Sequence, residues 1–496
     1  MNYPIIFKML SLVLWTTTVA FSLCAGVSQI YAAEVSEAEA MPSWVCAIAL
    51  SAMSALAFYL PSRNAPTNIQ KKEAMCIVGV GWILVSILGA VPYFLILACP
   101  FPDAIFESAS GITTTGASIF GDVESIPRSL LFWRALSQWI GGLGVVLFFV
   151  AIISFLGSGA KTLYMGGGES GTHAGDVSDY ERIQSATMRI LAIYVIISLI
   201  CLAAFRLTGM GWFDGICHML ATVSTGGFSV YNDSIAHYKN SLIDWTVIFF
   251  MTLGGVNFMT IIMFLRGNFK RVFRNTEFKT YIAILASVSV AIAIILLHDK
   301  NLFTIDTWSN AITKSAFQTV SIMTTTGFAT SNYQEWLPFT HVALFIIMIL
   351  GGCAGSTSGG LKVLRGVVAF KFVKRDIVKS FRPRLVLPLR LNGKVLDTED
   401  ADTIMSHICL YSIICIFGFW VLATLEPDMS FSGCISAVVS CTSNVGPGLA
   451  EVGPDKNYGF MNGASKIFLS CLMVMGRLEF YSILVLFMPS LWRKFQ

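Results

Sequence analysis

Four short segments rich in threonine and serine recur along this chain, and each ends at a glycine. They read FESASGITTTGAS with Gly116, ICHMLATVSTGGFS with Gly226, FQTVSIMTTTGFAT with Gly327 and SAVVSCTSNVGPG with Gly446, and these glycines lie 110, 101 and 119 residues apart. β-Branched threonine favours an extended backbone, and glycine permits backbone angles or close approaches that other residues resist. Carbonyl oxygens in a ring, with hydroxyls nearby, can replace the hydration shell of a monovalent cation. The segments are therefore candidate ligands for such an ion.

The same elements surround each of the four segments. About ten mildly apolar residues precede it, and an apolar run that could cross a membrane lies on either side. Non-helical backbone at membrane depth is tolerated only where it is buried in protein or lines a water-filled path. We therefore expect four repeats of span, short re-entrant helix, polar segment and span, arranged with pseudo-four-fold symmetry around one central pore.

The composition places the chain in a membrane. Of its 496 residues 55% are apolar and 12% charged, and the mean hydropathy is +0.71, beyond the range of ordinary soluble proteins. A helix needs roughly 20 apolar residues to cross the hydrocarbon core. We predict an all-α polytopic protein with ten spans. They lie at Met9–Ile30, Trp44–Leu60, Met75–Cys99, Ala135–Leu156, Ile190–Phe205, Trp245–Leu265, Thr280–Leu297, Val342–Leu361, Ile408–Leu425 and Ile467–Met488.

The basic residues give the orientation, because Lys and Arg collect in cytoplasmic loops. If the N-terminus is inside, the start of the chain, 61–74, 157–189, 266–279, 362–394 and the C-terminal tail hold 24 of the 33 Lys and Arg residues. Both termini are therefore expected in the cytoplasm. The first run could instead be a cleaved signal peptide, but it is long for one, and Ile30 or Tyr31 would occupy a cleavage position that prefers a small residue.

A second landmark follows each segment after 24 to 30 residues. It reads WIGGLG (Gly141, Gly142), TLGGVN (Gly254, Gly255), ILGGCA (Gly351, Gly352) and VMGRLE (Gly476, Arg477). Small residues at helix contacts explain the glycine pairs by themselves, but they do not explain the Thr-rich segments upstream. Two landmarks in register four times indicate a true internal repeat.

Two features break the repeat and are candidate control elements. The stretch 351–360, GGCAGSTSGG, has five glycines, each of which costs a helix up to about 1 kcal/mol relative to alanine. We expect an irregular loop beneath the segments, able to obstruct the path, although a close-packed kinked helix is the alternative. Arg477 takes the place of a glycine, and a mid-span charge costs at least about 2.5 kcal/mol. It should face either the pore or an acidic partner.

Acidic residues follow all four segments and would raise the local cation concentration at an outer mouth, although loops commonly carry acids in any case. These residues are Asp122, Glu124, Asp233, Glu335, Glu451 and Asp455. The twelve cysteines form no C-x-x-C pair and fit a structural role. An enzyme is not indicated, because Lys161-Thr162 does not complete a phosphate-binding loop and no H-E-x-x-H or G-x-S-x-G occurs. The net charge of +4 reflects topology and not a nucleic-acid partner.

Taken together, the four segments, the stretch GGCAGSTSGGLKVLR and the late MGRLEF resemble the Trk/Ktr/HKT superfamily of potassium and sodium transporters, specifically the bacterial Trk-type potassium-uptake membrane subunit. The resemblance covers residues 75 to the end. The two earlier spans also resemble the Trk branch, which carries an extra N-terminal helix pair.

The resemblance implies a role for each motif. A potassium-binding filter would consist of Thr113, Thr114, Thr115, Gly116, Val223, Ser224, Thr225, Gly226, Thr324, Thr325, Thr326, Gly327, Ser443, Asn444, Val445 and Gly446. A gate would consist of Gly351, Gly352, Cys353, Ala354, Gly355, Ser356, Thr357, Ser358, Gly359 and Gly360, and Arg477 would be the family's pore-side arginine. Glycine in all four units fits potassium, whereas Asn444 and Val445 depart from the hydroxyl pattern.

The resemblance also implies the setting. We expect potassium uptake across the bacterial inner membrane by a multi-pass homodimer, with K⁺ as the transported ion, no organic cofactor, and regulation by a cytosolic TrkA-like ring of nucleotide-binding subunits. The ten basic residues of 362–394 could dock that ring or anionic lipid headgroups. A proton- or sodium-coupled symporter is the alternative, although few acids lie within spans.

The expected organisation has five parts. A helix pair over 1–74 precedes the pore repeats 75–187, 188–279, 280–400 and 401–496, the third of which contains the gating loop and the basic segment.

Overall fold

The computed structural model describes residues 1–65, 69–155, 179–299 and 305–492. Lys161 and Thr162, considered above, lie outside these ranges. The described chain is almost entirely helical, as predicted. A two-stranded antiparallel hairpin of β1 (Arg390–Leu391) and β2 (Lys394–Val395) is the exception.

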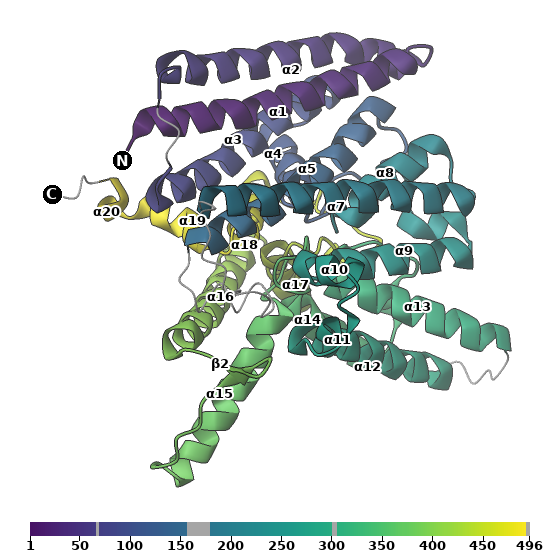
Figure 1. Ribbon diagram of the computed structural model, residues 1–496. Helices are drawn as coiled ribbons and strands as arrows, with labels where there is room; N and C mark the ends of the chain where they lie inside the picture. The colour runs from purple at the N-terminus through teal and green to yellow at the C-terminus, as the bar shows by residue number, and fades with distance from the viewer. Residues whose placement is uncertain (66–68, 156–178, 300–304, 493–496) are drawn as a thin grey trace.

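The N-terminal helices form an antiparallel pair along one side of the bundle (Figure 1). Helix α1 spans Tyr3–Ile30 and α2 spans Val35–Tyr59, followed by a 3₁₀ turn, η1, at Leu60–Ser62. Thr18 Oγ1 and Ser51 Oγ join the two helices at 2.6 Å, a buried bond of the kind that holds membrane helices together. The pair packs on α3 (Lys71–Leu97) and, through α1, on α5 (Arg128–Phe155).

Four helices of 12 to 19 residues, the short helices, each lie between two flanking helices, in the order that the sequence predicts. They are α4 (Phe101–Ile112), α8 (Trp212–Val223), α13 (Ile305–Met323) and α17 (Phe431–Ser443). The flanking helices are α3 and α5, α7 (Asp179–Leu207) and α9 (Ser241–Gly254), α12 (Thr276–Asp299) and α14 (Pro338–Leu350), and α16 (Thr398–Leu425) and α18 (Gly463–Arg477). The C-terminal halves of the short helices are buried in protein, as a re-entrant element requires.

Three of the expected spans are not continuous helices. Within the described residues, seven helices are long and apolar enough to cross a membrane, or nine if each of two bent pairs counts once. Helix α9 bends by 104° into α10 (Phe258–Leu265), and α18 bends by 111° into α19 (Tyr481–Leu484) and the 3₁₀ turn η5 (Val485–Phe487). Expected span Val342–Leu361 ends as a helix at Leu350. The glycine-rich landmarks lie at these interruptions, and the total of ten crossings stays a prediction.

The two ends of the described chain lie close together. Ile5 and Leu10 near the start of α1 share a hydrophobic cluster with Leu486 in η5, ahead of α20 (Pro489–Trp492). The beginning of α1 therefore lies at the same end of the bundle as α20 (Figure 1), as an even number of crossings requires. The cytoplasmic placement of that end stays a prediction.

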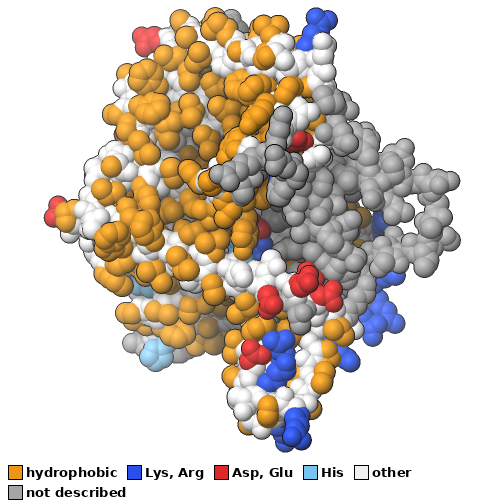
Figure 2. Space-filling model, turned by 90° about the vertical axis from the view of Figure 1, so that its left-hand side faces the viewer, with side chains coloured by type: hydrophobic (Ala, Val, Ile, Leu, Met, Phe, Trp, Pro, Cys, Tyr) orange, Lys and Arg blue, Asp and Glu red, His pale blue; other side chains and the backbone are white. Residues whose placement is uncertain are grey.

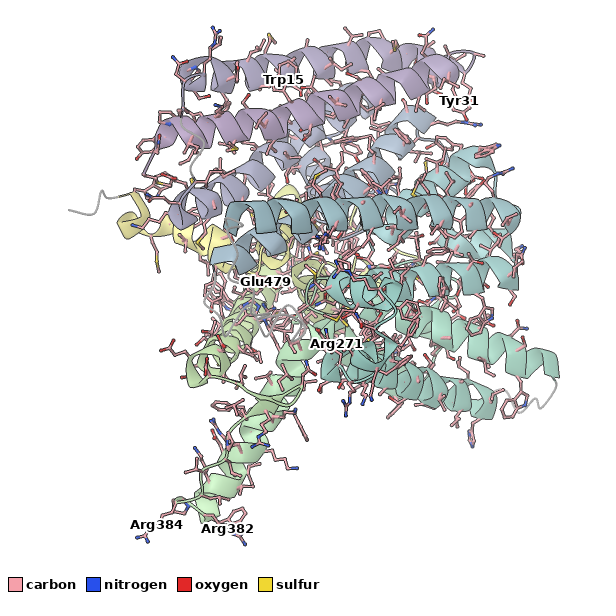
Figure 3. All side chains as sticks on the ribbon, in the orientation of Figure 1. Trp15, Tyr31, Arg271, Arg382, Arg384 and Glu479 are labelled. Atoms are coloured by element: carbon pink, nitrogen blue, oxygen red, sulfur yellow. The ribbon has the colours of Figure 1, made fainter. Side chains whose placement is uncertain are left out.

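Helix α15 (Val363–Phe381) projects from the body as an arm (Figure 1). Phe370, Val373 and Ile377 form an exposed apolar stripe along it, and Lys and Arg side chains gather on the same arm (Figure 2). Arg382 and Arg384 lie at its tip, away from the bundle (Figure 3). Lys371 donates to the carbonyl of Arg390 at 2.8 Å, which fastens the β hairpin to the helix. Short α11 (Phe269–Val272) precedes α12 at another basic turn.

A carboxylate of the N-terminal pair caps the helix that follows the first segment. Glu37 on α2 is fully buried, and its Oε1 accepts the backbone N–H of Ser129 at 2.8 Å. Ser129 is the second residue of α5, and its Oγ accepts the indole N–H of Trp44 at 2.9 Å. A negative group at a helix N-terminus satisfies an otherwise unpaired donor and complements the helix dipole.

Replacing Glu37 with Ala should lower the free energy of unfolding by roughly 1–2 kcal/mol, the usual cost of a lost N-cap. The measurement is the apparent unfolding temperature of the detergent-solubilised protein. Glu39→Ala is the matched control, because Glu39 is exposed two residues further along α2. Equal unfolding temperatures for the two variants would contradict the cap.

Candidate functional site

The four segments share one backbone conformation. Thr114, Thr225, Thr325 and Asn444 have positive φ values of 53°, 54°, 57° and 57°. Each N–H bonds the carbonyl three residues earlier, and the next N–H bonds the carbonyl five residues earlier, for example Thr114 to Gly111 at 3.0 Å and Thr115 to Ser110 at 2.9 Å. The extended backbone that β-branched threonine favours is therefore not adopted at this residue.

This conformation concentrates strain at the site. A left-handed L-residue costs roughly 1–2 kcal/mol, and a β-branched one is a conspicuous outlier. Such strain persists only where the surrounding structure fixes it, commonly at functional positions. Asparagine tolerates the left-handed region better than threonine. Asn444 therefore suits the backbone of the fourth segment, although it breaks the hydroxyl pattern.

The equivalent glycine lies two residues after each left-handed residue. Gly116, Gly227, Gly327 and Gly446 have φ values of 80°, 82°, 84° and 100°. The second segment is thus aligned one residue later than the sequence analysis placed it. Its residues equivalent to Thr113–Gly116 are Ser224, Thr225, Gly226 and Gly227, and Val223 is the last residue of α8.

These glycines close the segments into a ring. A Cβ on Gly116 would lie 2.2 Å from the carbonyl oxygen of Gly226, and one on Gly227 would lie 1.8 Å from that of Thr326. A Cβ on Gly327 would lie 2.2 Å from the oxygen of Val445, and one on Gly446 would lie 2.6 Å from that of Thr115. The glycine of each segment therefore lies against a carbonyl oxygen of the next segment. That carbonyl belongs to the residue just before the next segment's own glycine. No larger residue fits these four junctions without movement.

Several hydroxyls of the segments are already used by the protein. Thr113 Oγ1 donates to the carbonyl of Ala109 at 2.6 Å, and Thr324 Oγ1 donates to that of Val320 at 2.7 Å. Ser224 Oγ makes the same bond to Leu220 at 2.7 Å. These hydroxyls satisfy the ends of the short helices. Each short helix directs its partly negative C-terminus toward its segment, which favours a cation there.

The paired glycines of the second landmark allow their helices to approach the C-terminal ends of the short helices closely. A Cβ on Gly141 would lie 1.8 Å from the carbonyl oxygen of Ile112, and one on Gly476 would lie 1.9 Å from that of Thr442. The next position meets a tyrosine that the sequence analysis missed. A Cβ on Gly142 would lie 2.8 Å from the hydroxyl of Tyr194, and one on Gly255 would lie 2.4 Å from that of Tyr281. These tyrosines would be found only by aligning the first helices of the repeats.

The backbone from 351 to 362 is irregular and largely buried, as its glycine content predicts. Gly351, Gly355 and Gly360 have positive φ values, which only glycine adopts readily. Thr357 Oγ1 lies 3.1 Å from the carbonyl oxygen of Gly254 and 3.2 Å from Thr225 Oγ1.

The same loop reaches two further segments. The N–H of Gly359 bonds Thr325 Oγ1 at 2.7 Å. A Cβ on Gly359 would lie 2.0 Å from the carbonyl oxygen of Ser443. The loop therefore contacts three of the four segments, counting that of Thr225.

Arg477 lies beside this loop and is 3% exposed. Its Nη1 donates to the carbonyl of Thr357 at 2.7 Å, while Nε and Nη2 have no hydrogen-bond partner within the described part of the chain. The acid nearest to it in sequence, Glu479 (labelled in Figure 3), pairs with Arg365 of α15. Among the described residues Arg477 forms no ion pair with an acid, so the structure does not support the alternative of an acidic partner.

The acidic residues after the segments join neighbouring loops. Asn232 donates to Asp122 at 3.1 Å and through its backbone to Glu124 at 3.2 Å, and this amide bond lowers the pKa of Asp122. Asn332 likewise lies 3.4 Å from Glu335 and 3.2 Å from Asp455. These four acids and Asp233 are exposed. Glu451 instead accepts from Ser430 at the start of α17.

Two buried groups behind the first segment escaped the sequence analysis. Arg134 was counted as an outer-loop residue, but it lies inside α5, 2% exposed, and pairs with Glu107 of α4. Gln138, one turn further, donates to the carbonyl of Gly226 at 2.7 Å and accepts from the N–H of Phe228 at 3.1 Å. A charged residue within the apolar part of each of these two helices was the available signal for the ion pair.

Comparisons with known proteins agree with this architecture. The sequence model of TrkH, described as a cation transport protein, matches residues 38–494. The chain belongs to the TrkH family. It is 32% identical over 438 residues to the Trk system potassium uptake protein TrkH of Salmonella typhimurium, covering 88% of this chain and 89% of that one. TrkG of Escherichia coli K12 is 31% identical, covering 87% and 88%.

A solved structure extends the match to the whole fold. The crystal structure of the potassium transporter TrkH from Vibrio parahaemolyticus superposes with a TM-score of 0.87 at 27% identity, covering 99% of this chain and 100% of that one. The TrkH family comprises membrane transporters and not enzymes, in agreement with the apolar helices described above. The roles of individual site residues stay predictions.

The close approach at Gly141 predicts that Gly141→Ala separates α5 from the end of α4. We expect a lower unfolding temperature and reduced ion flux through purified protein in liposomes. Gly144→Ala on the same helix is the control, because its Cβ would meet only Trp82 at 3.6 Å. Since alanine favours a helix over glycine by up to about 1 kcal/mol, the control should be neutral or slightly stabilised. Equal behaviour of the two variants would refute the role of this contact.

Proposed function

We propose that this chain mediates potassium uptake across the bacterial inner membrane through a central path lined by the four segments. The ring of glycine-to-carbonyl contacts carries the proposal. In this ring each of the four segments contacts the next, although they lie about a hundred residues apart in the sequence. The relatives named above are Trk system potassium uptake proteins, which supports K⁺ as the ion.

The filter is formed by the backbone carbonyls of Thr113–Gly116, Ser224–Gly227, Thr324–Gly327 and Ser443–Gly446. Thr113, Ser224 and Thr324 already donate their hydroxyls to helix ends, so carbonyls are the better ligands at these positions. Dehydrating K⁺ requires many oxygens at once, and a closed ring supplies them from four directions. The exposed acids around the loops attract cations toward the outer mouth.

The loop 351–360 serves as the gate beneath this filter. Its contacts to the second, third and fourth segments support this role. Arg477 holds the carbonyl of Thr357 and so adds a positive charge that opposes cation passage while the loop is in place. Withdrawal of the loop would remove both obstacles together.

The assembly follows the family pattern. The helix pair 1–74 and the four repeats 75–187, 188–279, 280–400 and 401–496 form one protomer of a homodimer. The basic arm, α15 with its hairpin, receives the cytosolic nucleotide-binding ring. Its exposed stripe and its Lys and Arg side chains supply both apolar contact and charge for this docking (Figure 2).

A proton-coupled symporter would need acids that exchange protons along the path. Three buried acids of the repeats are instead held by fixed partners: Glu107 by Arg134, Glu479 by Arg365, and Glu277 by the N–H of Ala354 at 2.6 Å. Each of these carboxylates is held by a fixed partner, which argues against a chain of proton-exchanging groups along the path. A passive channel is therefore the better reading of the site.

Purified protein in a lipid bilayer with a potassium gradient should pass a current that reverses near the potassium equilibrium potential at every pH gradient tested. The measurement is the reversal potential with K⁺ and pH gradients varied independently. A reversal potential that follows the pH gradient would replace the channel by a coupled carrier. A bilayer without protein gives the background leak current as the control.

Replacing Thr357 with Val should raise the open probability at unchanged selectivity. The substitution keeps the side-chain shape but removes the hydroxyl beside Gly254 and Thr225. One hydrogen bond is worth about 1 kcal/mol, so the ratio of open to closed time should rise about fivefold. Single-channel recording measures this ratio. Ser356→Ala is the control, because its hydroxyl bonds Cys353 within the loop itself, and an equal effect there would count against Thr357 as an anchor.

A further inference from the structure

A buried ion pair lies directly behind the first segment. Arg134 Nε and Nη2 approach Glu107 Oε1 at 2.8 and 2.7 Å, and the two side chains are 2% and 0% exposed. A charge pair at this depth is costly to desolvate, and replacing it with apolar residues is often neutral or stabilising. Simple packing of α4 on α5 therefore does not require it.

The pair holds the chain that leaves the first segment. Glu107 accepts the N–H of Ile119 at 3.1 Å and the hydroxyl of Ser118 at 3.1 Å. Arg134 Nη2 lies 3.0 Å from the same Ser118 oxygen. Ser118 follows Gly116 by two residues. The carboxylate and guanidinium thus fix where this segment ends.

The arginine also reaches the second segment. Its guanidinium carbon lies 4.1 Å from the centroid of the Phe228 ring, and Nη1 lies 3.4 Å from the carbonyl oxygen of Ser229. Phe228 directly follows Gly227. One guanidinium therefore bridges the exits of two neighbouring segments, and its planar donors and face fix distance and direction together.

The other repeats use different groups at the position of Glu107, seven residues before the left-handed residue. His218 lies there in the second repeat, and its Nε2 is 3.0 Å from Ser229 Oγ. Gln318 lies there in the third repeat and donates to Ser331 at 3.3 Å, and Ala437 occupies the fourth. The first repeat alone among these carries an ion pair at the position, so the junction between the first and second segments is braced differently from the others.

We propose that Glu107 and Arg134 are positioning residues for ion selectivity, which hold the first segment at a fixed distance from the second. This inference rests on the proposed function, in which the segments form the filter. Neither residue touches the ion. They act through Ser118, Ile119 and Phe228, so loosening the pair changes how well the ring fits K⁺ relative to Na⁺.

The test is the K⁺/Na⁺ permeability ratio of reconstituted protein, from reversal potentials under mixed-ion gradients. Arg134→Lys keeps the charge but not the fork of donors, and we expect the ratio to fall about tenfold, the scale of one charged hydrogen bond. Ser118→Ala keeps the ion pair intact and cuts one link, and should lower the ratio by a smaller factor. Asp103→Asn is the matched control, because it breaks another ion pair of α4, to Lys466 at 2.8 Å.

If Arg134→Lys fails to fold, the double variant Glu107→Gln with Arg134→Gln is measured in its place. The double variant leaves no uncompensated charge. This double variant should fold and still lose selectivity. A purely structural pair would instead lower the unfolding temperature of Arg134→Lys and the double variant while the ratio stays at the wild-type value, and that result would overturn the proposal. The ratio of Ser118→Ala decides the question if neither of these variants folds, and an unchanged ratio there would also overturn it.

A separate variant distinguishes failure of the inference from failure of the function. Gly116→Ser adds a side chain where a Cβ would lie 2.2 Å from the carbonyl of Gly226, and it should abolish selectivity if the ring is the filter. Loss of selectivity in Gly116→Ser but not in the ion-pair variants would refute the positioning role alone. Wild-type protein that conducts no K⁺, or a Gly116→Ser variant with unchanged selectivity, would refute the proposed function itself.

Discussion

The structure depends on one constraint: irregular backbone at membrane depth must be enclosed by other protein. Four segments meet this constraint by enclosing one another. Each offers the carbonyl before its glycine to the glycine of a neighbour, and the contacts run from Gly116 through Gly227 and Gly327 to Gly446 and back. Because a Cβ at any of these positions would overlap an oxygen, the glycines are required by the closure itself. In the proposed function, ion preference depends on the same contacts because they set the radius of the ring.

The same constraint explains features further from the ring. A short helix must stop abruptly at each segment, and the left-handed residue after it redirects the chain at a cost in strain. The long helices then pack against the exposed helix end, which requires the glycines at Gly141 and Gly476. Tyr194 and Tyr281, each from the first helix of the following repeat, fill the space beside Gly142 and Gly255. Tyr411 of α16 lies 2.8 Å from Ser443 Oγ in the fourth segment. The glycine pairs are thus explained by the segments and not by general helix packing.

Much of this arrangement could be predicted from the sequence, because composition and spacing report it directly. The four segments, the short helices before them and the irregular backbone of 351–360 all leave local signals. The register of the second segment could not be read, since Gly226 and Gly227 are both glycine and only the backbone angle separates them. The breaks after Gly254 and Arg477 were missed because hydropathy does not detect a bend between two apolar pieces.

Contacts between residues that are distant in sequence could not be predicted either. Glu107 and Arg134, for example, indicate a role only once the structure shows that they form an ion pair.

The departures from four-fold symmetry are distributed in a way that separates holding from gating. The loop beneath the ring contacts the second, third and fourth segments through Thr357 and Gly359. The first segment is held instead from the side, by the amide of Asn444 on Thr115 at 3.0 Å and by the pair of Glu107 and Arg134 behind it. A loop that withdraws therefore releases contacts to three segments while the braces of the first remain in place. In the proposed function, a ring with one independently fixed member keeps its radius while the loop withdraws, as a selective pore with a movable gate requires.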